Sequence, residues 1–170
     1  MTTETQIIRF GESRNVPNHP ELPVLVYRQA IRADEGSLAE ALESRYRDNG
    51  WGGIWRWGVY DFHHYHSNAH EVLGVASGEA DLTLGGPDGK TLNVRAGDVV
   101  ILPAGTGHKN KRSSDDFLVV GAYPEGQVNQ DLIRSEQTLD DSIRQRIRET
   151  ALPQRDPVFG AGGPLLDEWQ

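Results

Sequence analysis

The spacing of hydrophobic residues changes twice along the chain and divides it into an N-terminal arm, a central β region and a C-terminal segment. Apolar runs at residues 7–10 and 22–31 are typical of short strands. A capping box at Ser37–Glu40 is followed by Leu38, Leu42 and Tyr46 at four-residue spacing. This pattern predicts a helix that ends at Asn49-Gly50.

From residue 54 to residue 123 the pattern is that of strands separated by short, regularly placed turns. Apolar and polar residues alternate over 80–84, as expected for a strand with one buried face. The continuous apolar runs at 99–102 and 117–122 predict strands that are buried on both faces. We therefore predict an all-β fold in which antiparallel strands form a barrel or a sandwich.

The C-terminal segment returns to a helical pattern. Thr138 is expected to cap a helix with Leu139, Ile143 and Ile147 on one stripe, and Pro153 is expected to stop it. The tail from Asp156 to Gln170 is rich in glycine and proline but too apolar for a free linker. We expect the tail to pack along the barrel or on a neighbouring subunit.

Length and composition fit one compact domain over residues 1–170. We divide it into an arm and helix at 1–53, a β core at 54–123, and a helix and tail at 124–170. The absence of cysteine excludes disulfides and thiolate metal ligands, so any ligands come from histidine and carboxylates. The net charge of -8 argues against nonspecific binding to nucleic acid, which needs a basic surface.

The start of the chain, Met1–Thr5, lacks the positive and apolar segments of a secretion signal. No later stretch is long and apolar enough to cross a bilayer. We therefore expect a cytoplasmic protein without a membrane partner.

Candidate chemistry is concentrated in two histidine clusters. The first reads G-x5-H-x-H-x4-E-x6-G from Gly58 and contains His64, His66 and Glu71. The second reads G-x5-P-x-G-x2-H from Gly97 and ends at His108. His64 and His66 share one face of a strand, and the other two residues adjoin turns, so a metal site with three nitrogen ligands and one oxygen ligand is plausible.

These two spacings together resemble the paired motifs of the cupin superfamily over residues 58–112. The resemblance implies a jelly-roll barrel, or double-stranded β-helix, with a short N-terminal helix, a C-terminal helix and a tail. It also implies that His64, His66, Glu71 and His108 bind one divalent transition metal. Donors of this kind suit Fe, Mn, Ni, Zn or Co and do not choose among them.

Other polar residues near the motifs are candidates for further roles. His70 is an alternative metal ligand if Glu71 does not coordinate. Tyr60 is a substrate-binding candidate because it shares the predicted face of the metal ligands. Asn110 and Arg112 return to the face of His108 on an extended strand, and the Arg112 guanidinium suits a carboxylate or phosphate. Arg112 also departs from the family pattern, which usually has asparagine there, although a solvent-facing arginine fits as well.

The family includes oxygenases, decarboxylases, isomerases and proteins that only bind ligands, and a fold does not select among these. Our first hypothesis is a metal-dependent enzyme of oxygenase type that acts on a small polar or anionic molecule. The alternatives are a non-catalytic module that binds or senses a small molecule, and a cupin isomerase or decarboxylase.

The last expectation is a homodimer. Trp55 and Trp57 are predicted on the outer face of the barrel, opposite Tyr60. These side chains, the apolar tail and the N-terminal strands all need burial, which pairing with a second copy would provide.

Overall fold

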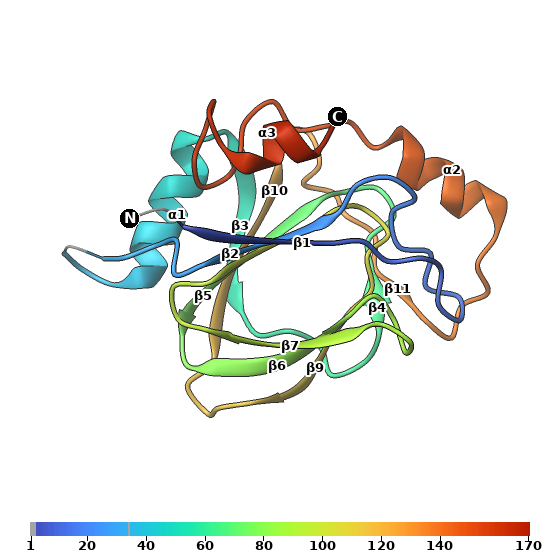
Figure 1. Ribbon diagram of the computed structural model, residues 1–170, viewed down its shortest axis with the longest axis horizontal. Helices are drawn as coiled ribbons and strands as arrows, with labels where there is room; N and C mark the ends of the chain where they lie inside the picture. The colour runs from blue at the N-terminus through green and yellow to red at the C-terminus, as the bar shows by residue number, and fades with distance from the viewer. Residues whose placement is uncertain (1–2, 34) are drawn as a thin grey trace.

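The computed structural model describes residues 3–33 and 35–170; Met1 and Thr2, on which part of the expectation about secretion rests, lie outside them. Most of the regular structure is β-sheet (Figure 1). The strands are β1 (Glu4–Ile8), β2 (Val24–Arg28), β3 (Trp51–Trp57), β4 (His64–Tyr65), β5 (Glu71–Ser77), β6 (Glu79–Leu84), β7 (Lys90–Arg95), β8 (Val99–Leu102), β9 (His108–Ser113), β10 (Leu118–Pro124) and β11 (Ile133–Arg134). The helices are α1 (Leu38–Asp48), α2 (Asp141–Glu149) and α3 (Pro164–Glu168).

The strands of the described residues form two antiparallel sheets. The first has the order β1-β2-β8-β5-β10-β3, and the second has the order β11-β4-β9-β6-β7. Strands that follow each other along the chain therefore often lie in different sheets, which is the topology of a jelly roll. This arrangement confirms the predicted all-β class and barrel architecture.

The space between the sheets is filled by alternate residues of the facing strands. Val24 and Val26 of β2 point inward, as do Ala80, Leu82 and Leu84 of β6. The polar residues between the last three face outward, so the alternation predicted from the sequence is confirmed.

The opposite face of the first sheet is also buried, under α1 and the C-terminal tail (Figure 1). Leu25 and Tyr27 of β2 pack there against Leu42 and Tyr46 of α1 and against Trp169 of the tail. Burial on both faces explains the continuous apolar runs along β8 and β10. The tail packs on the barrel of its own chain, which is one of the two positions expected for it.

A buried carboxylate fixes the tail to the sheet. Asp156 accepts hydrogen bonds from the Tyr27 hydroxyl at 2.5 Å and from the backbone N–H groups of Val158, Phe159 and Leu165. Its side chain is fully buried. Four donors thus satisfy one carboxylate, which the sequence pattern did not suggest.

Helix boundaries follow from their caps. Ser37 caps α1 by accepting a hydrogen bond from the N–H of Glu40, as predicted. The prediction for the second helix is wrong by two residues, because Asp140 rather than Thr138 is the N-cap of α2. The Asp140 carboxylate accepts from the N–H of Ile143, and its charge favours the helix N-terminus.

The region between β3 and β5 also differs from the prediction. β3 begins at Trp51, three residues before the expected start of the β region, and ends at Trp57. Residues 58–63 form a connection, and β4 contains only His64 and Tyr65. Side-chain parity therefore cannot be counted from β3 to the histidines. No helix in the described part of the chain is long and apolar enough to span a membrane.

Candidate metal centre

The two sheets bring the four candidate metal ligands together at one end of the barrel. His64 lies on β4 and pairs in register with His108, the first residue of β9. His66 follows β4, and Glu71 is the first residue of β5 in the other sheet. Each residue lies at or next to a strand end, and all four side chains are buried.

Three of the four residues form a group that could hold a metal ion. One ligand atom each from His66, Glu71 and His108 lies within 4.8 Å of the others. The Nε2 atoms of His66 and His108 lie 3.5 Å and 3.3 Å from the Glu71 carboxylate oxygens. His64 is outside this group, but its ring centroid is 4.0 Å from that of His108.

The backbone determines which nitrogen of each ring is available. Nδ1 of His64 lies 2.9 Å from the Phe62 carbonyl, and Nδ1 of His108 lies 3.0 Å from the Thr106 carbonyl. Nδ1 of His66 contacts the carbonyl of Asp131. Because a carbonyl oxygen only accepts, each Nδ1 carries the proton and each neutral ring keeps a free lone pair on Nε2.

The charges at the site are coupled. Burial alone would raise the pKa of Glu71, but the neighbouring His66 and His108 outweigh it and lower that pKa. Burial likewise opposes protonation of His66, but the Glu71 carboxylate raises the pKa of His66. Burial and the adjacent His108 lower the pKa of His64 to about 2, so His64 stays neutral. The site therefore places the Glu71 carboxylate against imidazole rings, an arrangement that favours added positive charge.

The donor set fits a metal ion for a specific reason. Oε1 of Glu71 is buried without a hydrogen-bond partner, although Nε2 of His108 is 3.3 Å away. With the proton of His108 on Nδ1, two buried acceptor atoms face each other. A cation between them would satisfy both, whereas two unpaired acceptors cost free energy.

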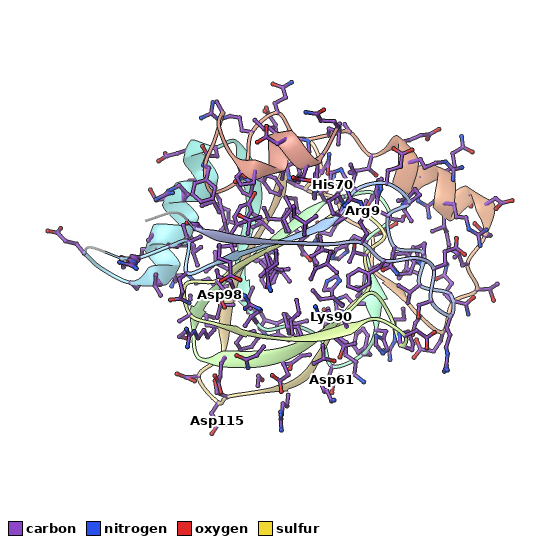
Figure 2. The ribbon with its side chains drawn as sticks, viewed as in Figure 1. Arg9, Asp61, His70, Lys90, Asp98 and Asp115 are labelled. Carbon is purple, nitrogen blue, oxygen red and sulfur yellow. The ribbon has the colours of Figure 1, made fainter. Side chains whose placement is uncertain are left out.

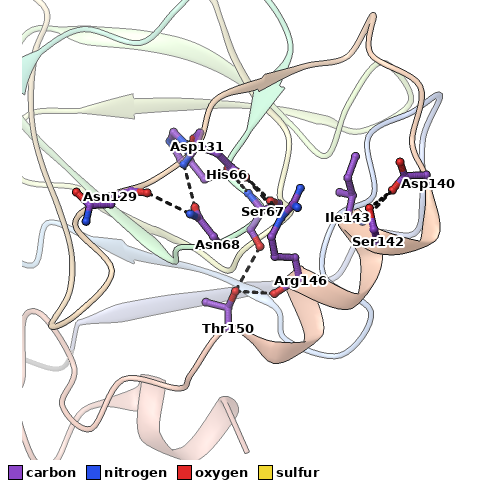
Figure 3. A network of polar contacts seen from close by, with 10 residues as sticks. All are labelled: His66, Ser67, Asn68, Asn129, Asp131, Asp140, Ser142, Ile143, Arg146 and Thr150. Atoms are coloured by element: carbon purple, nitrogen blue, oxygen red, sulfur yellow. Dashed lines mark hydrogen bonds and ion pairs between the residues drawn. The ribbon is translucent and has the colours of Figure 1, made fainter.

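A polar network lies beside His66, on the side of its Nδ1 atom (Figure 3). The Asp131 carboxylate accepts from the N–H of Ser67 at 2.7 Å and from the Ser67 hydroxyl. Nε of Arg146, from α2, donates to Oγ of Ser67 at 2.8 Å, and the Thr150 hydroxyl donates to the Ser67 carbonyl. This network fixes the segment whose Asp131 carbonyl contacts His66.

The turn in the second histidine motif has a related role. Gly105 has a φ of +88°, which glycine adopts without strain, and its N–H donates to the His66 carbonyl at 2.8 Å. A Cβ at this position would lie 2.7 Å from Ile147 of α2. The glycine thus allows the two motifs and α2 to approach closely.

The four residues lie in the wall of a cavity of about 430 Å³. Tyr123 and Leu73 line its interior, and Trp57, Tyr60 and Leu132 lie where it opens to solvent. The volume is in the range typical of small-molecule sites. Tyr60 lies at this cavity, and its role in binding substrate stays a prediction.

The prediction that Trp55 and Trp57 face outward is wrong, because both line this cavity. The prediction counted parity through residues 58–63, which are not a strand. Trp55 lies over Gly121 of the paired strand β10, where a Cβ would be 2.2 Å from the indole. Nε1 of Trp55 donates to the Tyr123 hydroxyl at 3.1 Å.

Arg112 and Asn110 do not line the cavity. The pairing of β6 with β9 shifts by one residue, so that Leu82 pairs with Asn110 while Asp81 pairs with Arg112. This bulge at Lys111 turns Arg112 to the outer face, where Nε donates to the Asp81 carboxylate at 2.7 Å. The expectation that Arg112 shares the face of His108 is therefore wrong.

His70 and His63 also lie away from the cavity. His70 is fully buried on the other side of the first sheet, where its ring centroid is 4.9 Å from that of Trp169 (Figure 2). Nδ1 of His70 accepts a hydrogen bond from the N–H of Ala104. Because consecutive residues point to opposite faces, His70 lies opposite Glu71 and does not replace it in the group described above.

Sequence reasoning missed several residues of the site. Tyr123 could have been found from parity, because it is four residues after Val119, whose side chain lies between the sheets. Ser67 and Asp131 gave no signal, since their contacts join segments 64 residues apart.

Comparison with known proteins agrees with this geometry. A model of the Cupin domain family matches residues 58–120, which include both histidine motifs. The chain belongs to the cupin superfamily. It is 41% identical over 169 residues to "Uncharacterized protein YjlB" of Bacillus subtilis (strain 168), and the match covers 99% of each chain.

Solved structures are similar at a lower level. A double-stranded β-helix protein from Klebsiella pneumoniae has 17% identity and a TM-score of 0.40, over 79% of this chain and 85% of that one. Acireductone dioxygenase from Bacillus anthracis, with cadmium in its active centre, has 15% identity and a TM-score of 0.39, over 56% of this chain and 68% of that one.

Proposed function

We propose that the protein is a metal-dependent enzyme of oxygenase type, in which His64, His66, Glu71 and His108 bind one divalent transition metal. One observation carries the proposal: Nε2 of His66 and Nε2 of His108 lie 3.5 Å and 3.3 Å from the carboxylate oxygens of buried Glu71, whose Oε1 has no hydrogen-bond partner. A site that only stabilised the barrel would pair these acceptors with donors.

The protein's own residues prepare the site for chemistry. The carbonyls of Phe62, Thr106 and Asp131 fix the tautomer and orientation of the rings, which lowers the cost of arranging them when a ligand binds. The buried side chains of Leu73 and Tyr123 line the inner wall of the cavity. The cavity opens beside the histidines, so a small molecule can reach them from solvent.

Imidazole and carboxylate donors suit Fe, Mn, Ni, Zn or Co. When bound, such an ion would supply Lewis acidity and, in the case of iron, redox chemistry with oxygen. Four protein ligands leave positions open on an octahedral ion. We therefore favour a reactive centre over a closed structural one.

The first experiment measures metal binding. The purified protein is stripped with a chelator, loaded separately with each of the five metals, and analysed for bound metal. We expect one equivalent in the unchanged protein and a loss of at least about tenfold in affinity in His108→Ala. His63→Ala is the matched control, because it removes a histidine that does not line the cavity. Equal binding by both variants, or no binding at all, would refute the metal centre.

Oxygen consumption separates an oxygenase from a module that only binds ligands. The iron-loaded protein is mixed with candidate small molecules in an oxygen electrode, with His108→Ala as the inactive reference. Uptake that requires His108 supports an oxygenase. A protein that binds metal and ligand without oxygen uptake would instead be a binding module.

A further inference from the structure

Exposed apolar side chains gather at the mouth of the cavity. In the part of the chain that the structure describes, seven large hydrophobic residues are exposed, and Trp57, Tyr60 and Leu132 line this cavity. Trp57 is 56% exposed, although indole is among the most favourable side chains to bury. A concentration of apolar surface around a concave site is typical of ligand binding.

The aromatic rings at the mouth hold one another in place. Trp57 meets Tyr60 edge to face with centroids 4.8 Å apart, and Tyr60 stacks on Phe62 at 4.8 Å. Tyr60 also contacts the ring of His64 edge to face at 5.2 Å. The rim is therefore preorganised next to the proposed metal ligands, which reduces the entropy cost of binding a ring against it.

The charges around the cavity disfavour an anionic ligand. Among the described residues that line the cavity there is no lysine or arginine, whereas the carboxylates of Glu71 and Asp131 both belong to it. The nearby arginines are engaged elsewhere. Arg134 lies 3.8 Å above the Phe62 ring, and Arg146 donates to Ser67.

We propose that the cavity binds an uncharged, planar aromatic molecule. Its ring lies against Trp57 and Tyr60, and its oxygen-bearing end points toward His64, His66 and His108. The role of that end rests on the proposed metal centre, while the role of the ring does not. This assignment replaces an anionic ligand, which was expected in part because Arg112 was placed at the cavity.

Two probes of different chemistry test the inference by calorimetry on the zinc-loaded protein, since zinc does not oxidise them. Catechol carries two adjacent oxygens on a neutral ring, whereas oxalate carries two adjacent carboxylates without a ring. We expect Trp57→Ala and Tyr60→Ala each to weaken catechol binding about tenfold and to change oxalate binding less than about twofold.

A matched control separates the rim from aromatic surface in general. Phe159 is 37% exposed, against 38% for Tyr60, but lies in the C-terminal tail outside the cavity. Phe159→Ala should leave the affinity for both probes unchanged. Thermal unfolding of each variant checks that it is folded. If one of the two rim variants does not fold, the other rim variant provides the test.

Several outcomes would overturn the inference. They are an absence of catechol binding, an unchanged catechol affinity in both rim variants, and an equal loss of affinity for both probes. Disruption of a dimer by Trp57→Ala, without loss of catechol binding, would assign the exposed ring to a second copy of the chain. If the protein binds no zinc, the proposed metal centre fails, and catechol binding by the metal-free protein and its rim variants still tests the aromatic site.

Discussion

Replacing Asp131 with alanine should weaken metal binding, although the proposed ligand set does not include its side chain. The Asp131 carboxylate holds the N–H and hydroxyl of Ser67, and the Asp131 carbonyl contacts Nδ1 of His66 (Figure 3). Without the carboxylate, the segment that carries this carbonyl loses its attachment. His66 would then sample orientations in which Nε2 no longer points toward Glu71.

The size of the effect follows from burial. Ser67 is fully buried, so each of its two donors left without an acceptor costs about 1–3 kcal/mol. The ion pair of Asp131 with Arg146 spans 3.8 Å and is partly exposed to solvent, so it contributes about 0–1 kcal/mol. The hydrogen bonds to Ser67 therefore dominate. Loss of a group that orients a ligand typically lowers metal affinity about 10–100-fold, which we expect for Asp131→Ala.

Competition with a chromogenic zinc chelator would measure this affinity. Asp131→Asn keeps an oxygen that can accept from the Ser67 N–H, so it should fall between alanine and the unchanged protein. Asp115→Ala is the charge-matched control, because Asp115 lies at the turn between β9 and β10 and does not line the cavity. A zinc affinity of Asp131→Ala within about twofold of the unchanged protein would refute the positioning role.

Three further predictions concern pH, the tail and Arg112. Glu71 raises the pKa of His66, so a proton competes with the metal for this ring. Zinc affinity should therefore fall by about tenfold for each pH unit below that pKa, and calorimetry should detect the protons released on binding. An affinity that is constant between about pH 5 and 8 would contradict this competition. Asp156→Ala leaves the Tyr27 hydroxyl and buried N–H groups without an acceptor. Urea unfolding should therefore show that the free energy of unfolding falls by at least about 3 kcal/mol, and a fall below about 1 kcal/mol would contradict the role of Asp156. Arg112→Ala removes the ion pair with Asp81, in which the arginine side chain is 82% exposed, so metal content and catechol affinity should not change. A clear loss of either would indicate that Arg112 contributes to the site.

The sequence was sufficient to bring the four proposed ligands together because their placement depends on short distances along the chain. His64 and His66 are separated by one residue, and Glu71 follows them after a turn. The remaining step was the pairing of His64 with His108, which the jelly-roll order of strands provides. Local spacing therefore grouped the first three residues, and the jelly-roll fold implied by the family resemblance added His108.

Contacts between distant segments were beyond the same reasoning. The Asp131 carbonyl reaches His66 across 65 residues, and Asp156 reaches the Tyr27 hydroxyl across 129 residues. Aspartate in a polar or glycine-rich segment usually indicates a turn or a solvated surface. Only the folded chain shows that these two carboxylates are hydrogen-bonded and that one of them is fully buried.

The errors about the cavity wall have a common physical cause. Alternation of faces holds only along an unbroken strand, and one extra or unpaired residue reverses it. The connection at residues 58–63 brought Trp55 and Trp57 to the cavity, and the shift at Lys111 moved Arg112 away from it. One break lies between the tryptophans and His64, and the other lies between His108 and Arg112. Neither break separates the four proposed ligands. The cavity wall contains aromatic rings in place of the predicted arginine, so it favours an apolar, planar ligand over an anionic one.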